Sequence, residues 1–441
     1  MTMMNNSEYK RKLFNSTFRQ ILLCYFIRGI KSTVRSIPKI TSVFMIVAVF
    51  VVTLFQQNNN HKTDTIFVGL NKLAQFSSIF LIIVLFASAF IILMILFGKP
   101  KCARRYHNDF HRCGMVNSAG ESPALIERTK RRNSRIEKLV FFSKGLPLSL
   151  WNDNKEKIES SLNLSIDSIE QGRDKHHFVV YAIDGCYVLP ERIDWNPALI
   201  SNKNSVLVLG ESLANTVEVD LSKIPHLLLA GSTGSGKTVL LRLILMQCAL
   251  KGFEVYIADF KGGVDFNKSW RRHTRIITES DDLTLCLNEL VEELHRRKRL
   301  FAELDCTNID EYNKRFGKQI QRIVFGCDEV AELLDKTGLD KKEKNTIALY
   351  EASIATIARL GRAFGIHLIL ATQRPDANII NGQIKNNVDF RACGRADNVL
   401  SQIILDKGDA SDLISKTAQG RFLTNSDVLF QAYYFDDSKG W

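Results

Sequence analysis

A glycine-rich stretch near the middle of the chain constrains the fold more than any other part of the sequence. Residues 231–238 read Gly-Ser-Thr-Gly-Ser-Gly-Lys-Thr, a glycine followed by four residues and then Gly-Lys-Thr. The apolar run His226–Ala230 before it predicts a buried strand, and the stretch Thr238–Leu250 after it predicts a helix. In a strand-to-helix turn of this kind, backbone N–H groups and the helix N-terminus face an anion. The stretch therefore predicts a phosphate-binding loop.

The residue types in this loop are those that bind a nucleoside triphosphate with its metal ion. Glycines allow the phosphates to approach the backbone closely, Lys237 is expected to reach the β- and γ-phosphates, and Thr238 is expected to hold Mg²⁺. A glycine-rich turn with a chance lysine is the alternative, and the predicted strand and helix on either side argue against it. We therefore expect ATP and Mg²⁺ as cofactors, with the loop residues Gly231, Ser232, Thr233, Gly234, Ser235, Gly236, Lys237 and Thr238 binding them.

From about Val206 onward, patterns that predict strands alternate with patterns that predict helices. Helices are expected at about 281–304 and 345–362, and further strands at 254–258, 275–278, 322–327, 367–371 and 390–393. Such alternation implies an α/β fold with a mostly parallel sheet and helices on both faces. Ligands bind to sheets of this kind beyond the carboxyl ends of the strands.

Two carboxylates follow one of the predicted strands. Asp328 and Glu329 come directly after the apolar run Ile323–Cys327. At the end of a buried strand, Asp328 can orient Mg²⁺ through water, and Glu329 can polarise the attacking water. A surface Asp-Glu pair is the plain alternative, but the position downstream of a phosphate loop favours the catalytic interpretation.

Other strand ends carry polar side chains as well. Gln373 follows the apolar stretch Leu368–Thr372, and we expect it to sense the γ-phosphate. Asp259 and Lys261 are expected to end the strand next to the phosphate-loop strand, with Asp259 contributing to nucleotide binding. Each of these residues could instead be a plain turn residue.

Phosphoryl transfer often uses a cation supplied by a second subunit. The phosphate loop, the Asp328-Glu329 pair and the segment around Gln373 are the three motifs of the predicted site. The only arginine in them is Arg374, which precedes a proline and is expected to point out of the site. Arg359 and Arg362, near the end of a predicted helix, are therefore candidates to serve a neighbouring subunit's site. Solvated arginines that interact with the helix C-terminus are an equally good interpretation of these two residues.

Two uncharged apolar runs lie in the N-terminal part of the chain. One covers Ile40–Phe55 and extends to about 38–56, and the other covers 76–97. Two such runs on either side of a polar loop predict two membrane spans rather than two buried core helices.

The basic residues around these runs predict their orientation. The loop 56–75 has only Lys62 and Lys72 as lysine or arginine residues, whereas 28–39 and 99–105 each contain four. By the positive-inside rule, the two spans form a hairpin in the cell membrane, with both termini and the phosphate-binding part in the cytoplasm.

The remaining segments complete an expected domain plan. The apolar residues Leu22, Leu23, Tyr25, Phe26 and Ile30, which interrupt the basic N-terminal segment, predict an interfacial amphipathic helix. The plan is a basic N-terminal segment 1–39, a membrane hairpin 40–97, a basic linker 98–145, a small α/β domain 146–205 and the nucleotide-binding domain 206–441.

Composition limits the partners and the chemistry. The net charge of +12 favours an anionic partner, either nucleic acid or a membrane surface. The nine cysteines include no Cys-x-x-Cys pair, so the sequence predicts neither a disulfide framework nor a cysteine-based metal site.

Taken together, the motifs resemble the FtsK/SpoIIIE family of membrane-anchored DNA-translocating ATPases. The resemblance rests on Ile224–Thr238, Asp328–Glu332 and Gly365–Pro375, followed in the family's order by 382–387 and 404–406. It covers about half of the chain and implies a RecA-like motor, a homo-hexameric ring and DNA moved through a central channel. In such a ring Lys385 is a candidate phosphate contact, and contacts of this kind make DNA binding independent of sequence.

The layout of the chain departs from the chromosome-segregation members of the family. Those usually have four membrane spans, a long linker and a C-terminal winged-helix reader, whereas here two apolar runs and a short linker precede the motor pattern. The compact layout is more similar to TcpA-type coupling proteins of Gram-positive conjugative elements, which implies a relaxase and channel proteins as partners. Chromosome segregation, protein secretion by an ATPase of the same superfamily and a non-catalytic membrane scaffold are the alternatives.

Overall fold

The computed structural model describes residues 6–59, 68–130, 135–317, 320–373 and 382–439. The chain divides into two compact units, Met1–Tyr187 and Val188–Trp441. Each unit has its own sheet and its own hydrophobic core.

The second unit is built on one long sheet, which in the described residues has eleven strands. Its order is β10-β9-β11-β12-β8-β13-β14-β15-β6-β7, with β5 paired to β15. The strands from β10 to β13 are parallel: β10 (Arg275–Ile277), β9 (Glu254–Ala258), β11 (Ile323–Cys327), β12 (Ile366–Thr372), β8 (Leu227–Ala230) and β13 (Phe390–Cys393). The path continues through antiparallel pairs: β14 (Arg421–Thr424), β15 (Leu429–Tyr434), β6 (Val206–Ser212) and β7 (Thr216–Asp220), while β5 is Ile193–Asp194.

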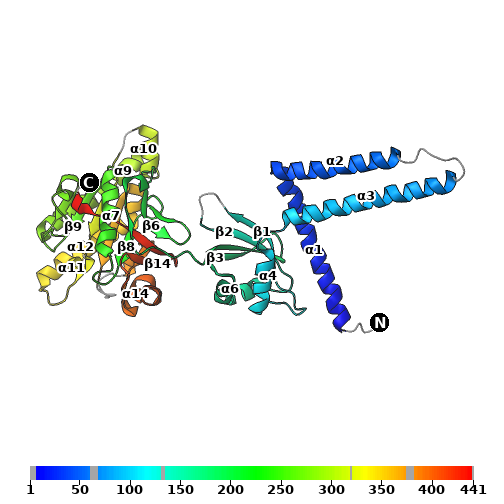
Figure 1. Cartoon of the computed structure of the whole chain (residues 1–441). Helices are drawn as coiled ribbons and strands as arrows, with labels where there is room; N and C mark the ends of the chain where they lie inside the picture. Colours follow the sequence, from blue (N-terminus) through cyan, green and yellow to red (C-terminus); the bar gives the residue numbers. More distant parts are fainter. Residues whose placement is uncertain (1–5, 60–67, 131–134, 318–319, 374–381, 440–441) are drawn as a thin grey trace. The chain divides into compact units, whose positions relative to one another are not determined.

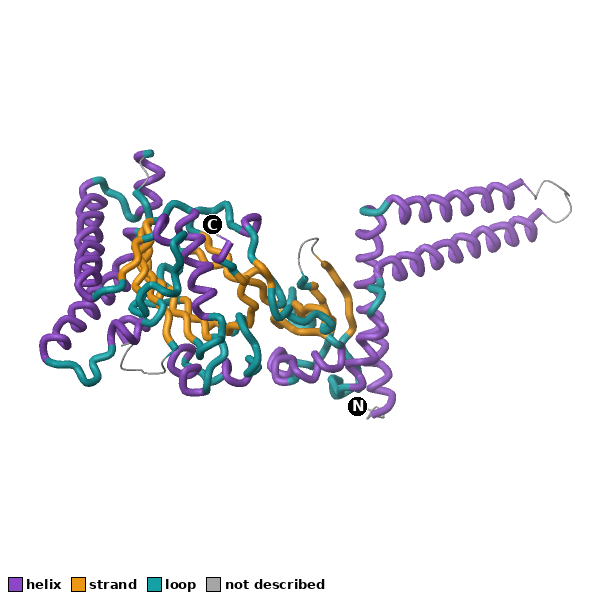
Figure 2. Tube along the Cα trace, turned by 60° about the vertical axis from the view of Figure 1, so that its left-hand side comes forward, coloured by secondary structure: helices purple, strands orange, loops and turns teal. Residues whose placement is uncertain are grey.

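Helices cover both faces of this sheet, and Figure 2 shows its strands running between them. Alternate side chains of β8 point to opposite faces, as the pleat of a strand requires. Leu227 and Leu229 pack with α7 (Lys237–Leu250) and α8 (Trp270–His273). Leu228 and Ala230 belong to the core on the other face, with α9 (Ser280–Glu303), α11 (Val330–Leu334), α12 (Lys341–Phe364), α14 (Asn398–Leu405) and α15 (Asp409–Leu413). The shorter elements are η1 (Pro197–Leu199), α10 (Ile309–Phe316), α13 (Gly382–Lys385) and η2 (Asp437–Lys439).

The expected α/β fold with a mostly parallel sheet is confirmed. The strand expected at 390–393 has those bounds, and the helix expected at 281–304 is α9, shifted by one residue. The strand order corrects one expectation. We placed the strand of Asp259 and Lys261 next to the phosphate-loop strand, but β9 pairs with β10 and β11, and two strands separate it from β8.

The first unit begins with three long helices, α1 (Asn6–Val34), α2 (Ile37–Asn59) and α3 (Val68–Gly98). Within α2 and α3, the stretches Ile37–Gln56 and Phe76–Gly98 are long and apolar enough to cross a membrane, and almost none of their side chains are buried. They agree with the two spans expected from the sequence. Figure 1 shows α2 and α3 side by side as a hairpin, with α1 running across its base.

The rest of the first unit is a four-stranded antiparallel sheet in the order β1-β2-β4-β3. Its core contains a group of packed aromatic rings in which Trp151 stacks on Phe178, with ring centroids 5.0 Å apart, and Phe110 meets Trp151 edge-on at 5.4 Å. The elements are α4 (Ala103–Arg112), β1 (Ala124–Lys130), β2 (Glu137–Phe142), α5 (Leu148–Asp153), α6 (Lys155–Leu162), β3 (Leu164–Gln171) and β4 (His177–Asp184).

This sheet corrects the expected domain plan. We expected 98–145 to be an irregular basic linker, but α4, β1 and β2 lie in it and form part of the small domain. The charged end of β1 hides the strand pattern, because its first three residues are buried and its last four are exposed. The unit boundary at Tyr187 also assigns residues 188–205 to the second unit rather than to the small domain.

Candidate functional site

The phosphate loop lies between β8 and α7, as the sequence predicts. Gly236 adopts a φ of 96°, and a Cβ there would lie 2.9 Å from the backbone nitrogen of Gly420, so glycine is needed for both conformation and space. Neighbouring segments hold the loop by its backbone. The N–H of Ser232 donates to the carbonyl of Arg395 (2.8 Å), and the N–H of Gly420 donates to the carbonyl of Ser235 (2.8 Å).

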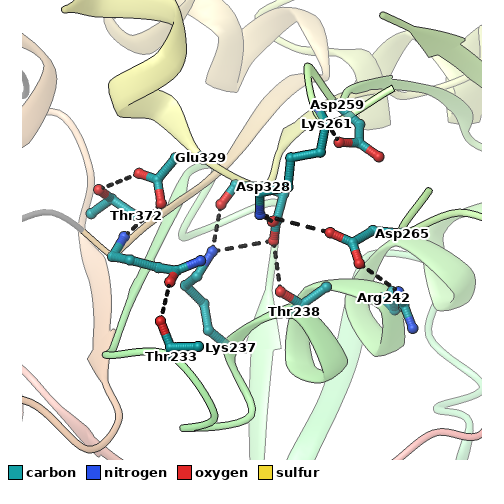
Figure 3. A network of polar contacts seen from close by, with 11 residues as sticks. Thr233, Lys237, Thr238, Arg242, Asp259, Lys261, Asp265, Asp328, Glu329 and Thr372 are labelled. Atoms are coloured by element: carbon teal, nitrogen blue, oxygen red, sulfur yellow. Dashed lines mark hydrogen bonds and ion pairs between the residues drawn. The ribbon is translucent and has the colours of Figure 1, made fainter. Parts of the chain in front are cut away.

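Asp328 lies at the centre of the site, at the end of β11 (Figure 3). Although β12 separates β11 from β8, the carboxyl ends of the parallel strands lie at one edge, so Asp328 reaches the phosphate loop. Its Oδ1 accepts a 2.9 Å hydrogen bond from the hydroxyl of Thr238 and lies 3.2 Å from Nζ of Lys237. Its Oδ2 lies 2.8 Å from Nζ of Lys261. The carboxylate therefore contacts two lysines and the hydroxyl expected to hold a metal ion.

The two lysines keep Asp328 ionised in a buried position. Burial raises the pKa of a carboxyl group, but Lys237 and Lys261, with the hydrogen bond from Thr238, outweigh it and hold the pKa of Asp328 below its ordinary value. Asp259 has the opposite balance. Burial is the largest effect on it and raises its pKa, although its Oδ1 accepts a hydrogen bond from the N–H of Lys261.

Oxygen ligands for a hard cation are present at this point. Thr238 Oγ1 and Asp328 Oδ1 are in contact, and hydroxyl and carboxylate oxygens are the groups that Mg²⁺ prefers alongside phosphates and water. The pair that we expected to hold Mg²⁺ therefore fits that ion.

Glu329 points away from Lys237 and toward the end of β12 (Figure 3). The hydroxyl of Thr372 donates to its Oε1 (2.8 Å), and the N–H of Gln373 donates to its Oε2 (2.9 Å). Oε1 of Gln373 in turn accepts a 2.9 Å hydrogen bond from the hydroxyl of Thr233. A chain of contacts thus joins the phosphate loop, Gln373 and Glu329.

A cavity of about 280 Å³ opens beside the loop. One wall is formed by Gly234, Gly236 and the first turn of α7, and the other by residues 419–420 and the end of β15. Among the residues that line it, the guanidinium of Arg192 lies 3.8 Å from the ring centroid of Tyr434. Flat apolar and cationic surfaces of this kind suit a planar aromatic ring. Sequence motifs gave no indication of this cavity, because its second wall comes from antiparallel strands without a recognisable pattern.

Two further cations lie near the loop. The sequence motifs did not indicate Arg395, and they indicated Lys261 only as a residue at a strand end. Arg395, in the turn after β13, donates through Nη2 to the carbonyl of Thr233 and through Nη1 to that of Lys416 (2.8 Å). Lys261 contacts Asp328 as described above. Cations of the same chain therefore also lie at the site, so a neighbouring subunit is not its only source of positive charge.

The two candidate arginines lie elsewhere on the motor. Arg359 and Arg362 are exposed near the end of α12, and Arg362 donates to the carbonyl of Ser222, which precedes β8 (3.3 Å). They are therefore near the amino ends of the parallel strands, whereas the phosphate loop follows the carboxyl end of β8. Arg374, which we expected to point out of the site, lies outside the residues that the structure describes.

The candidate DNA contact is engaged within the chain. Nζ of Lys385 lies 2.6 Å from Oδ1 of Asp406, whose Oδ2 also accepts from Arg391 (2.8 Å). A role of Lys385 in DNA binding stays a prediction.

Comparison with known proteins places these features in a family. The FtsK/SpoIIIE family model matches residues 200–377, which contain the phosphate loop, Asp328 and Gln373. The solved structure of the pCW3 conjugation coupling protein TcpA, in its monomer form with ATPγS, is 39% identical, with a TM-score of 0.57, and the match covers 77% of this chain and 97% of that one. The chain belongs to the FtsK/SpoIIIE family.

Two curated members of the FtsK/SpoIIIE family are similar over the motor part. The DNA translocase FtsK of Clostridium tetani is 34% identical over 242 residues, which are 52% of this chain and 31% of that protein. The DNA translocase SftA of Bacillus subtilis is 36% identical over 214 residues, 46% of this chain and 22% of that protein. The chain thus spans less than a third of the length of these two relatives.

Proposed function

We propose that this chain is a membrane-anchored ATPase that uses ATP hydrolysis to move DNA. The observation that carries the proposal is the meeting of Lys237, Thr238 and Asp328 at the end of parallel strands, with Glu329 beside them. Membership of a family with DNA translocases supports DNA as the substrate.

Each residue of the site has a place in this chemistry. Lys237 and the backbone of the phosphate loop bind the β- and γ-phosphates, while Thr238 and Asp328 hold Mg²⁺. The bound ion supplies positive charge against the charge that develops on the phosphates. Glu329, once it leaves Thr372 and Gln373, orients the attacking water and polarises it, and Gln373 reports the state of the γ-phosphate through Thr233.

The cavity beside the loop takes the adenosine part of ATP. Its walls are close to the glycines of the loop, and Tyr434 under Arg192 offers a surface for the purine ring. Asp259 lies further from the phosphate loop than we expected, because two strands separate β9 from β8. Its proposed contribution is therefore to position Lys261, whose N–H it accepts.

DNA binding is proposed to be electrostatic and independent of sequence. The positive net charge comes from residues 1–187, with 26 Lys and Arg against 13 Asp and Glu, whereas residues 188–441 have 33 against 34. In a homo-hexameric ring of motor domains, contacts to the phosphate backbone would therefore come from individual side chains such as Lys385 rather than from the net charge of the motor. Affinity should then fall as the salt concentration rises.

Within this activity we propose a role as coupling protein in conjugation, with a relaxase and channel proteins as partners. The match to TcpA over nearly the whole of its solved chain favours this role over chromosome segregation or protein secretion. Two observations test it: relaxase and mating-channel genes should lie near the gene, and replacing Lys237 by alanine should reduce transfer of the mobile element without a defect in chromosome partition.

The two exposed apolar helices are proposed to anchor the protein in the cytoplasmic membrane with both termini inside. Single cysteines at positions 60 and 112 test this orientation in intact cells, with native cysteines replaced. An impermeant thiol reagent should label position 60 only. Labelling of position 112 before lysis contradicts the topology.

The proposed activity is tested with the full chain in lipid nanodiscs. ATP hydrolysis is measured without DNA, with single-stranded DNA and with double-stranded DNA. We expect at least one DNA form to stimulate hydrolysis and Lys237→Ala to hydrolyse in none of the three conditions. Equal rates in all three conditions for the wild-type protein would argue against a DNA-driven motor.

A further inference from the structure

The first helix of the chain carries a row of exposed apolar side chains. Leu23, Ile27, Ile30 and Val34 are 56%, 47%, 42% and 74% exposed. Their spacing of four, three and four residues places them on one side of an α-helix. We call this set the α1 stripe. An exposed apolar surface of this kind, continued in one row over three turns, indicates a binding face.

The opposite side of α1 is fixed to the small domain. The hydroxyl of Tyr25 donates to the carbonyl of Leu125 (2.9 Å), and Nη1 of Arg28 donates to the carbonyl of Ile126 (2.6 Å). At 100° per residue, Tyr25 and Arg28 face away from the α1 stripe. The stripe therefore points away from the sheet of the small domain.

Contact with α3 fixes the direction of α1 as well. A Cβ on Gly29 would lie 1.8 Å from the carbonyl oxygen of Met94, and one on Gly98 would lie 1.8 Å from that of Tyr25. The two helices thus cross in backbone contact at the end of the proposed membrane span. Figures 1 and 2 both show α1 running across the base of the α2–α3 hairpin rather than along it.

From this geometry we infer that α1 lies in the membrane interface, with the α1 stripe inserted among the lipid headgroups and upper acyl chains. The stripe ends at Val34, and α2 begins at Ile37 with a side chain that is 77% exposed, so the apolar surface runs on into the first proposed span. The exposed side chains of Arg19 and Lys31 border the stripe, and the sequence has no acidic residue between Glu8 and Asp64. Basic residues beside an apolar face match an anionic lipid surface.

This placement rests on the proposed membrane anchoring, and it gives the anchor a second function. A helix held to the bilayer on one side and to the small domain on the other fixes that domain against the membrane. Without the contacts of α1, the small domain would be attached to the membrane anchor through the end of α3 only.

Tryptophan fluorescence with brominated lipids tests the inference on the full chain in nanodiscs. Ile27→Trp reports the stripe, Leu85→Trp reports the second span, and Leu349→Trp, on the exposed side of α12, is the matched control. Bromines near the headgroups should reduce the added emission of Ile27→Trp more than bromines near the chain ends, with the reverse order for Leu85→Trp. The added emission of Leu349→Trp should not change.

The outcomes separate this inference from the anchoring itself. If Leu85→Trp is quenched and Ile27→Trp behaves like Leu349→Trp, α1 does not contact lipid and the inference is wrong. If Leu85→Trp is not quenched either, the membrane anchoring fails and the inference fails with it. A photo-crosslinking residue at position 27 adds a direct readout: lipid adducts are expected, and covalent dimers without lipid adducts would assign the stripe to a second copy of this chain.

Discussion

The hydroxyl of Thr233 donates a 2.9 Å hydrogen bond to Oε1 of Gln373 and so connects the phosphate loop to the end of β12. The N–H of the same glutamine donates to Glu329. A movement of the loop on binding or losing phosphate can thus be transmitted through Gln373 to Glu329, the group that we propose to polarise the attacking water.

This connection predicts the effect of Gln373→Leu. Nucleotide binding should be kept, because Lys237 and the loop backbone remain. Turnover should fall on the order of a hundredfold, because the loop can no longer move residue 373 and release Glu329 from its N–H into the position for catalysis. Thr233→Val should lower turnover in the same way, and Thr233→Ser, which keeps the hydroxyl, should not. Measured kcat values for the two single variants and the double variant check this. Fully additive losses would show that the two side chains act independently.

Lys261 is predicted to compete with Mg²⁺ for Asp328, since its Nζ lies 2.8 Å from Oδ2. In Lys261→Met this positive charge is absent, so the Mg²⁺ concentration for half-maximal ATP hydrolysis should fall roughly fivefold, corresponding to about 1 kcal/mol of repulsion between nearby cations in water. Lys261→Arg keeps the charge and serves as the control. A higher Mg²⁺ requirement in Lys261→Met contradicts this role.

Stability of the motor domain is predicted to depend on pH through buried histidines. His226 accepts a hydrogen bond from the N–H of Leu368 (3.0 Å), and burial lowers its pKa from 6.5 to about 4. The folded chain therefore keeps it neutral while the unfolded chain binds a proton below pH 6.5, so stability falls as the pH falls from 6.5 toward 4. The slope from one such group is at most about 1.4 kcal/mol per pH unit.

Urea unfolding of the wild-type protein and His226→Gln at several pH values between 7 and 5 checks this contribution. The variant should be less stable at pH 7 but should lose less stability on acidification. Burial and the nearby Arg322 also hold the pKa of His367 well below its ordinary value, so part of the pH dependence should remain. An unchanged slope in His226→Gln means that this residue does not titrate on unfolding.

Arg359 and Arg362 are predicted to act on a neighbouring subunit, because they lie near the opposite ends of the strands from their own phosphate loop. A head-to-tail ring can bring such a surface to the next subunit's nucleotide. Arg359→Ala or Arg362→Ala should bind nucleotide without turnover, and mixing with Lys237→Ala should restore some hydrolysis. Arg395→Ala is the matched control, since Arg395 contacts its own phosphate loop and should not be rescued. If no arginine mixture exceeds the sum of its parents, these two residues do not act in trans.

The sequence predicted those parts of the site that depend on strand ends alone. The phosphate loop, Asp328 and Gln373 each follow an apolar run, and parallel strands bring such positions to one edge whatever their order. The order itself depends on pairing between distant segments, which is why β9 was placed beside β8. The cavity at Tyr434 and the contact of Arg395 with Thr233 depend on that pairing too. The hairpin of β1 and β2 was missed because its charged end has the composition of a linker.

We propose that ATP hydrolysis at the site of Asp328 and Glu329 moves the protein along DNA. The most direct measurement is ATP-dependent displacement of streptavidin from the biotinylated end of single- or double-stranded DNA by the full chain in nanodiscs. We predict displacement by the wild-type protein on at least one DNA form. Glu329→Gln should bind ATP and DNA but displace nothing, with hydrolysis reduced by at least about a hundredfold. If the wild-type protein hydrolyses ATP yet displaces streptavidin no faster than Glu329→Gln on either form of DNA, the chain is not a DNA translocase.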